Sequence, residues 1–404
     1  MFFLLNNKYR FNANRLVFAA FVFIANLYGQ TAIKKIKPSD TDPLINTFNS
    51  DSHYVYLNAT ASFKNLLVVH LPGSYGEPKR STLFGTLASD LGFHSIGLMY
   101  PNIPTVGSIC AGASDAFCFE NVRREIIEGM DYSSNISINS TECVLNRLKK
   151  LLMYLNANYP GENWGQYLTT NGELRYPKII FSGHSQGGGH AALIAKYYPI
   201  NRALCFSSPK DWSNFFGSPP LWLSSAGWLT LPNNIYCFNH TLDEHAKQLE
   251  IWDSLKIDQY GIPVNVDQNT APYQNTRQLT TSFWVPLGDE HSSTVQDAKT
   301  PKISGIPVFI PVWTYMLTSN VSTGLTQNGI NRIGVQLISN PTNKGVILEL
   351  ANLNFRIKIF DPSGRLLLDQ NAINGQHQIN LSDLASGFYY IQVTDGQNIF
   401  AKKF

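Results

Sequence analysis

The chain has 404 residues, of which 44% are apolar and 15% charged, enough for one large or two ordinary globular domains. Its formal charge at pH 7 is +3. Three basic residues, Lys8, Arg10 and Arg15, lie in the first 29 residues, which contain no acid, so the remainder carries no net charge. This neutral remainder gives no basis for binding nucleic acid or an anionic membrane.

The N-terminus has the pattern of an export signal. Its basic residues precede the apolar run at residues 16–27, and the small residue Gly29 follows. That run is too short to span a bilayer, and the whole pattern is typical of a cleaved signal peptide. We expect residues 1–29 to be a signal peptide and the mature protein to be exported. The alternatives are a buried first helix or a membrane anchor.

From about residue 50, short apolar strands alternate with amphipathic helices. The sequence predicts strands at 66–71, 95–99, 178–181, 202–207 and 234–239. It predicts helices at 81–91, 121–129 and 142–156, and in the alanine-rich stretch after residue 186. This alternation indicates an α/β domain with a largely parallel sheet over residues 50–318.

Export permits disulfide bonds, and the chain has five cysteines. Cys110 and Cys118 lie in the loop CAGASDAFC, close enough to close a short ring, and are the best candidate pair. Cys205 and Cys237 lie in apolar runs and are expected to be buried on strands. The partner of Cys143 is left open, and the odd count leaves at least one free thiol. No cysteine or histidine spacing suggests zinc.

Segment 212–231 lies between two late strands and is too irregular for a plain crossover helix. Its aromatic residues include Trp212, Trp222 and Trp228. These rings either bind a substrate beneath a cap or pack the segment onto the sheet, and the sequence leaves both interpretations open.

After about residue 325 the pattern changes to short alternating strands. They are predicted at 355–360, 365–368, 376–381 and 388–393, with turns at 361–364 and 395–396. We expect residues 335–404 to form a separate small β-sandwich, with residues 319–334 as a linker.

The stretch KIIFSGHSQGGGHAALIAKYY, residues 178–198, carries a candidate nucleophile, Ser185. The pentapeptide GHSQG lies between an apolar strand and a helix, where a G-x-S-x-G pattern exposes the serine hydroxyl on a tight turn. A serine attacks a carbonyl only when a base removes its proton and the resulting oxyanion is stabilised. The alternative is a glycine-rich turn with a purely structural role.

In such an architecture the acid follows the serine and the histidine follows the acid. Among nine histidines, His291 comes late, after the strand-like segment 282–285, and is the candidate base. Asp243, at the end of a predicted strand, is the favoured acid. Asp211 is its rival and Glu244 a further option, and either aspartate could instead cap a helix.

The oxyanion would be held by backbone amides. One is the amide of Gln186, at the start of the helix after the serine, and the second is that of Gly73 or Ser74, after an early strand. Gly73 is also explained as an ordinary turn residue. The mechanism needs neither a metal nor a cofactor.

Residues 60–318 resemble the α/β-hydrolase superfamily, and more narrowly a set of exported bacterial members whose substrates are undefined. The resemblance is carried by the motifs HLPGS, CAGASDAFCFENVRREIIEG, NRLKKLLMYL, SGHSQGGGHAA, FNHTLDEH and EHSSTVQD. It implies the α/β-hydrolase fold, with Ser185 as nucleophile, His291 as base and Asp243 as acid.

Residues 335–404 resemble the C-terminal sorting domain of the Por, or type IX, secretion system. The segments that carry this resemblance are NP at 340–341, DPSGR at 361–365, INLSDL at 379–384 and GFYYIQV at 387–393. The resemblance implies the secretion machinery as a partner, transport across the outer membrane, and then release or attachment to the cell surface. The alternative is a carbohydrate-binding or adhesive β module.

The expected function is hydrolysis of a carboxylic ester, in a small molecule or a polymer, through an acyl-enzyme. Esters of lipids, polysaccharides and synthetic-like polymers all fit. One alternative is a non-catalytic surface-binding protein that keeps the hydrolase fold, because a fold does not fix a function. Another is hydrolysis of amides or peptides by the same residues.

Overall fold

The structure is a computed structural model of the full chain. It describes residues 31–319 except 244, and in the C-terminal region residues 335–337, 345–350, 355–372, 375–382, 384–385, 387, 389–394 and 399–403. The expected signal peptide and, apart from residue 319, the expected linker lie outside the described residues.

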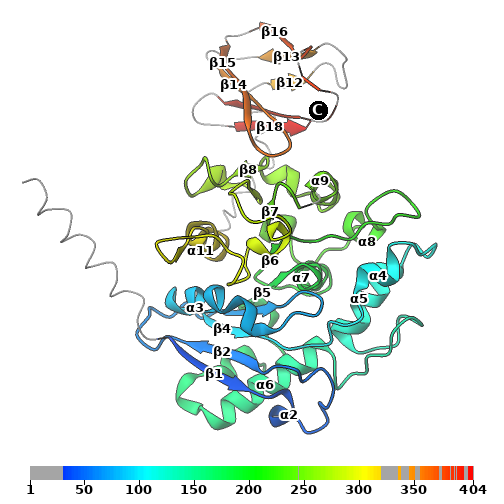
Figure 1. Ribbon diagram of the computed structural model, residues 1–404, viewed down its shortest axis with the longest axis vertical. Coiled ribbons are helices and arrows are strands. Elements are labelled where there is room, and N and C mark those ends of the chain that lie inside the picture. The colour runs from blue at the N-terminus through cyan, green and yellow to red at the C-terminus, as the bar shows by residue number, and fades with distance from the viewer. Residues whose placement is uncertain are drawn as a thin grey trace, which may run out of the picture.

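A nine-stranded sheet forms the centre of the larger domain, in the order β1-β2-β4-β3-β5-β6-β7-β9-β8 (Figure 1). Its strands are β1 (Ala32–Ile36), β2 (His53–Leu57), β3 (Leu67–Leu71), β4 (His94–Gly97), β5 (Ile179–His184), β6 (Arg202–Phe206), β7 (Ile235–His240), β8 (Val264–Asn265) and β9 (Gln278–Thr281). Neighbours from β4 to β8 are parallel, whereas β1 and β2 pair antiparallel. The predicted α/β domain with a mostly parallel sheet is confirmed.

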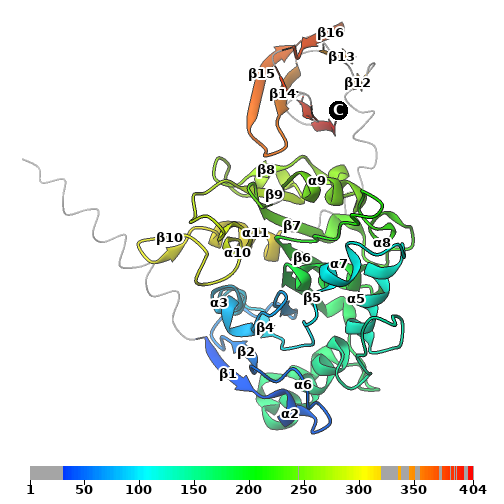
Figure 2. The same ribbon diagram turned by 45° about the vertical axis from the view of Figure 1, so that its right-hand side comes forward.

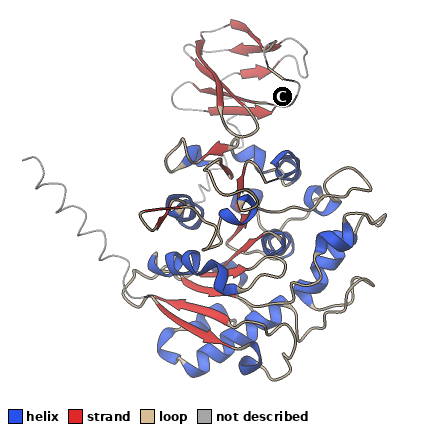
Figure 3. Ribbon diagram, in the orientation of Figure 1, coloured by secondary structure: helices blue, strands red, loops and turns tan. Residues whose placement is uncertain are grey.

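Helices cover both faces of this sheet (Figure 3). They are α2 (Pro38–Thr41), α3 (Thr82–Asp90), α4 (Val106–Cys110), α5 (Cys118–Glu128), α6 (Val144–Asn158), α7 (Gln186–Tyr197), α8 (Leu221–Ser224), α9 (His245–Ser254), α10 (Glu290–Ser293) and α11 (Ile310–Thr318). Short 3-10 helices are η2 (Pro78–Ser81), η3 (Pro160–Glu162), η4 (Trp164–Tyr167), η5 (Tyr176–Lys178), η6 (Pro232–Asn234), η7 (Ile257–Tyr260) and η8 (Tyr273–Asn275), and β10 (Lys302–Ile303) pairs with β11 (Ile306–Pro307).

The apolar runs read from the sequence are strands buried on both faces. On β5, Ile179 and Phe181 join the core beneath α5, α6 and α7, while Ile180 joins the core beneath α3 and α11. Successive side chains of a strand point to opposite faces, so a continuous apolar run fits a sheet covered on both sides.

Four strands of the central sheet, β1, β2, β8 and β9, lie outside the predicted strands, and two of them show why. Strand β1 begins the sheet well before residue 50; its sequence AIKKI lacks an apolar run because it is an edge strand with mostly exposed side chains. The strand expected at 282–285 is wrong, because the preceding residues, QLTT, form β9 and 282–285 follow it as loop. All four β9 side chains are buried, and the hydroxyl of Thr281 donates to Asp267 at 2.7 Å.

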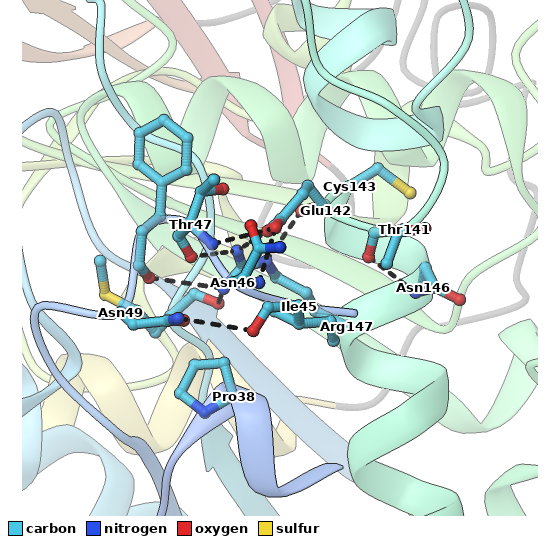
Figure 4. A network of polar contacts seen from close by, with 12 residues as sticks. Pro38, Ile45, Asn46, Thr47, Asn49, Thr141, Glu142, Cys143, Asn146 and Arg147 are labelled. Atoms are coloured by element: carbon cyan, nitrogen blue, oxygen red, sulfur yellow. Dashed lines mark hydrogen bonds and ion pairs between the residues drawn. The ribbon is translucent and has the colours of Figure 1, made fainter. Parts of the chain in front are cut away.

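A buried polar network holds the segment between β1 and β2 against α6 (Figure 4). Glu142 accepts hydrogen bonds from the amides of Asn46 and Thr47 at 2.9 and 3.0 Å. The fully buried Arg147 pairs with Glu142 and donates to the carbonyl of Thr47 at 2.7 Å. Each buried charge therefore has a charged partner and backbone partners, as burial requires.

The predicted disulfide between Cys110 and Cys118 is confirmed and joins α4 to α5. The other three cysteines are free and buried. Cys205 and Cys237 lie on β6 and β7, as the apolar runs around them predicted.

The C-terminal region is antiparallel, as expected, and its described strands form two sheets. One contains β12 (Val335–Leu337), β13 (Gly345–Leu350) and β16 (Gly375–Asn380), and the other contains β14 (Phe355–Phe360), β15 (Leu366–Ala372), β17 (Tyr390–Thr394) and β18 (Ile399–Lys403). This region lies beside β8 and α9 of the larger domain (Figure 2).

Specific contacts join the two regions. The hydroxyl of Thr280 donates to the carbonyl of Ser363 at 2.8 Å, and the side chain of Gln392 donates to that of Gln274 at 2.7 Å. Ile262 forms a small apolar cluster with Phe360 and Tyr390 of the C-terminal region. Among the described helices, none has the length and hydrophobicity that crossing a bilayer requires.

Candidate active site

Ser185 occupies a strained turn between β5 and α7. Its φ of 53° and ψ of −119° lie in a region that side-chain-bearing residues rarely adopt, and its amide is fixed by the carbonyl of Phe206 at 2.9 Å. The flanking glycines make this turn possible. A Cβ at Gly183 would lie 2.3 Å from the carbonyl carbon of Gly187, and one at Gly187 would lie 2.1 Å from the carbonyl oxygen of Leu71.

The two further glycines of the run let neighbouring side chains approach the first turn of α7. A Cβ at Gly188 would lie 2.6 Å from the side chain of Ser208. One at Gly189 would lie 2.4 Å from Nη2 of Arg123. The run of three glycines therefore follows from close packing around the start of the helix, beneath Ser185.

The loop after β3 lies directly against this turn. A Cβ at Gly73 would come within 3.1 Å of the Cβ of Ser185. The hydroxyl of Ser74 donates to the side-chain oxygen of Gln186 at 2.8 Å, and the amide of Val106 donates to the same oxygen at 2.9 Å. The structure thus brings together the predicted oxyanion loop, the first residue of α7 and the start of α4, which the disulfide ties to α5.

Asn102 and Tyr100 hold the loop after β3 in place. The side-chain amide of Asn102 donates to the carbonyls of Gly73 and Gly76 at 2.9 and 2.8 Å. The hydroxyl of Tyr100 donates to the carbonyl of Pro72 at 2.8 Å. These bonds fix the loop beside the N-terminus of α7. Helix N-termini carry unpaired amides and a partial positive charge that favour an anion.

His291 and Asp243 form a hydrogen-bonded pair. Asp243 follows β7, His291 lies in α10, and Nδ1 of His291 is 2.7 Å from Oδ2 of Asp243. The carboxylate is buried, whereas about a third of the imidazole is exposed, with 32% of its side-chain surface accessible. A buried carboxylate on one ring nitrogen orients the imidazole and leaves its other nitrogen for a second partner.

The second carboxylate oxygen of Asp243 accepts a hydrogen bond from Nζ of Lys210 at 2.9 Å. Burial raises the pKa of Asp243, but the hydrogen bond from His291 and the charges of His291 and Lys210 outweigh burial and hold this pKa below its usual value. Asp243 is therefore ionised at neutral pH, with both oxygens engaged.

His184, the chain neighbour of Ser185, contacts His291 from below. Burial, with a smaller effect of His291, lowers the pKa of His184 to about 3, so its ring is neutral. Its Nε2 lies 2.8 Å from the carbonyl oxygen of His291, which requires that this nitrogen carry the proton and donate. The two rings are 4.8 Å apart between centroids. The turn that carries Ser185 is thus bonded directly to the backbone of His291.

Asp211, the other acid candidate, has different partners. Arg123 donates from Nε to Oδ2 of Asp211 at 2.8 Å and forms a second contact through Nη2, while Nε1 of Trp222 donates to Oδ2 at 2.9 Å. Only 2% of Asp211 and 3% of Arg123 is exposed. Nη1 of Arg123 also donates to the carbonyl of Gln186 at 2.9 Å, so this ion pair fastens the first turn of α7. Glu244 lies outside the described residues.

The tryptophans of segment 212–231 lie in different environments. Trp222 is 1% exposed and stacks on Trp228 with centroids 6.2 Å apart, while Trp212 is half-buried with Nζ of Lys247 5.6 Å from its ring. Trp222 therefore packs this segment onto the larger domain and offers no open face to a ligand.

The sequence interpretation missed Lys210, Arg123 and Asn102. Arg123 stands in a run of charged residues that reads as a solvated helix face, and Lys210 and Asn102 follow strands without a distinctive motif. A signal for Arg123 existed in Gly189, because a third glycine inside a helix implies that a neighbour lies very close.

Comparison with known families assigns one part of the chain. Residues 338–404 match the family model of the secretion system C-terminal sorting domain, so the predicted sorting domain is confirmed. It indicates type IX secretion to the cell surface or outside, and it implies an interaction with the secretion machinery. Among curated proteins, none matches the chain.

Proposed function

We propose that the protein is an exported serine hydrolase of the α/β-hydrolase superfamily that cleaves carboxylic esters. The observation that carries the proposal is the 2.7 Å hydrogen bond between His291 and Asp243, with His291 also bonded through its carbonyl to the chain neighbour of Ser185. A carboxylate and an imidazole thus meet from two elements that are far apart in sequence, and a hydrogen bond ties that imidazole's backbone to the residue before the serine.

The topology supports the same fold assignment. Ser185, Asp243 and His291 follow β5, β7 and β9, and the chain order serine, acid, histidine is that of α/β-hydrolases. The strained turn at Ser185 is also the conformation expected of a G-x-S-x-G nucleophile between a strand and a helix.

The reaction would proceed in two halves. Nδ1–H of His291 donates to Asp243, which leaves Nε2 to accept the proton of the Ser185 hydroxyl as its oxygen bonds to the ester carbonyl carbon. The oxyanion is stabilised by the amide of Gln186 and an amide of the Gly73–Ser74 loop. His291 then passes the proton to the departing alcohol, and the acyl group remains on Ser185.

Water completes the cycle. His291 takes a proton from a water molecule as it adds to the acyl carbon, and it returns this proton to the Ser185 oxygen as the carboxylic acid leaves. Arg123 and His184 take no part in proton transfer. They position, respectively, the first turn of α7 and the backbone of His291.

A fluorophosphonate probe tests the proposal, because it forms a covalent bond with an activated serine. The full chain should be labelled, Ser185→Ala should not, and His291→Ala and Asp243→Asn should be labelled far more slowly. Asp211→Asn alters the other strand-end aspartate and should be labelled much faster than Asp243→Asn, once its rate is corrected for the fraction of protein that is folded. Correctly folded wild-type protein, judged by circular dichroism, that never reacts would refute a hydrolase and favour a binding protein. Initial rates with p-nitrophenyl acetate and acetyl p-nitroanilide then separate ester from amide hydrolysis.

A further inference from the structure

The loops that carry Ser74, Asp243 and His291 each also carry an exposed, large apolar side chain. Tyr75 adjoins Ser74 and is 60% exposed, and Leu242 adjoins Asp243 and is 75% exposed. In the loop from β9 to His291, Trp284 is 79% and Leu287 98% exposed. We call these four residues the apolar rim: Tyr75, Leu242, Trp284 and Leu287.

Three rim residues, Leu287, Trp284 and Leu242, are the most exposed large apolar residues in the described part of the chain. All seven tryptophans are described, and Trp284 alone is largely exposed, since four are buried and two half-buried. Leu287 stands at the tip of a turn closed by the hydrogen bond from the amide of Asp289 to the carbonyl of Pro286 at 2.9 Å, with Gly288 at a φ of 90°. Apolar side chains held in water by ordered loops are typical of a binding surface.

Three lysines on or beside these loops are paired with carboxylates. Lys210 bonds to Asp243, Lys299 lies 2.8 Å from Asp289, and Lys79, after the Tyr75 turn, lies 2.8 Å from Glu77. A lysine paired with a carboxylate gives little net positive field, so these three lysines offer little attraction to an anionic headgroup. Its chemistry favours an uncharged partner.

We propose that the apolar rim docks the protein on the fluid phase of an uncharged lipid ester, such as an emulsified triacylglycerol. This inference rests on the proposed function, because the lipid is the substrate whose ester reaches Ser185. Single side chains that protrude from loop tips gain most from a fluid that closes around them, whereas a rigid surface would touch them on one side only. The partly exposed Ser185 lies on the turn packed against Gly73, two residues before Tyr75, and the part-exposed His291 follows the loop that carries Trp284 and Leu287.

The test compares one uncharged ester below and above its solubility limit. Full-chain protein is assayed by pH-stat titration on tributyrin, with p-nitrophenyl acetate as the dissolved reference substrate. We expect the rate on tributyrin to rise sharply once droplets form. In Trp284→Ser/Leu287→Ser the ratio of the droplet rate to the reference rate should fall by about tenfold or more, because each lost side chain weakens docking.

The matched control is Leu229→Ser/Leu231→Ser, in which both leucines are more than half exposed, at 58% and 57%. The amide of Leu229 bonds to the carbonyl of Lys196, at the end of α7 away from Ser185. This variant should keep both rates and their ratio. The inference would be overturned if the tributyrin rate does not rise when droplets form. It would also be overturned if Trp284→Ser/Leu287→Ser keeps the wild-type ratio of droplet rate to reference rate.

Two further outcomes separate this inference from the proposed function. Wild type that hydrolyses p-nitrophenyl acetate but degrades a polycaprolactone film faster than tributyrin droplets overturns the lipid and assigns the rim to a solid polyester. Wild type that is folded yet inert on all these esters and on the fluorophosphonate probe overturns the proposed function itself.

Discussion

Two aspartates follow neighbouring strands of one sheet, and they have opposite surroundings. Asp211 lies beyond β6 and Asp243 beyond β7, and both are buried. Asp211 accepts hydrogen bonds from Arg123 of α5 and Trp222 of α8. Asp243 is held by Lys210 and His291, and His291 reaches the solvent.

The difference teaches that the position after a strand does not decide what a carboxylate does. The role of the carboxylate depends on which side chain a neighbouring element places beside it. Helix α5 brings a permanent cation to Asp211, because an arginine does not release its proton. The loop after β9 brings to Asp243 an imidazole, which can donate from one ring nitrogen while the other accepts a proton. One pair is suited to fastening and the other to proton transfer.

The largest expected effect is that of Asp243→Asn. The amide can no longer fix His291 in the tautomer that accepts from Ser185, and the corresponding change in serine proteases costs about 10⁴-fold in kcat. We expect a loss of kcat/KM of that order on p-nitrophenyl acetate, with little change in the far-ultraviolet circular dichroism spectrum. A variant within tenfold of wild type would mean that Asp243 is not the acid.

Asp211→Asn should have the opposite effect: a large loss of stability and a small loss of rate. It leaves Arg123 buried without its counter-charge, which typically costs about 3–5 kcal/mol in the free energy of unfolding. Urea denaturation measures this cost, and rates corrected for the folded fraction should fall much less than in Asp243→Asn. Removing both charges in Arg123→Met/Asp211→Leu should recover part of the stability. A stable Asp211→Asn protein with a rate as low as that of Asp243→Asn would exchange the roles of the two residues.

Much of the larger domain can be predicted because its strands obey a simple rule. Strands β3 and β5 each begin with an apolar run, which is typical of a strand in a sheet covered on both faces. Strands β1 and β9 escaped because their side chains are charged or polar, and what makes them strands is the ladder to their neighbours. A ladder is a contact between distant segments and leaves no local pattern.

The same division applies to the candidate site. Ser185 is conspicuous because strain at its backbone demands glycines on both sides, and those glycines are visible in the sequence. Asp243 and His291 could be proposed from chain order alone. Lys210 could not, because a lysine on a surface and one that reaches a buried carboxylate have the same sequence context. For Arg123, Gly189 signals only that some group lies close to the helix and does not say which one.

Gly189→Ala tests how firmly Arg123 is held beside Asp211. Alanine favours a helix by about 1 kcal/mol over glycine, but its Cβ would lie 2.4 Å from the guanidinium of Arg123. That group cannot swing aside, because it is bonded to Asp211 and to the carbonyl of Gln186. We expect a net loss of about 1–2 kcal/mol in the free energy of unfolding, as for other overpacked cores.

Gly107→Ala is the matched control for this change, since Gly107 lies in α4 and a Cβ there meets nothing within 4 Å. It should leave stability unchanged or raise it by up to about 1 kcal/mol. If Gly189→Ala behaves in the same way in urea denaturation, Arg123 is not pinned as the geometry requires.

Lys210→Met should have the smallest effect on stability, and it removes only the lysine charge beside Asp243. The folded state lowers the pKa of Asp243, so this carboxylate stabilises the fold above its unfolded pKa, near 4, and that stability is lost as the pH falls through the lower folded value. Without Lys210 the folded pKa moves up, and less stability remains to be lost. We expect Lys210→Met to be less stable than wild type by about 0.5–1 kcal/mol at pH 7, with the gap closing as acid protonates Asp243.

Urea denaturation of both proteins between pH 7 and the onset of acid unfolding measures this gap. Lys299→Met, which removes the lysine paired with Asp289, controls for the loss of a surface cation and should change stability by less than about 0.5 kcal/mol. A Lys210→Met gap that stays constant with pH would show that Lys210 acts through packing, because only an electrostatic contact is lost when its partner is neutralised. The pH dependence therefore distinguishes the two ways in which a lysine can hold an aspartate beside a histidine.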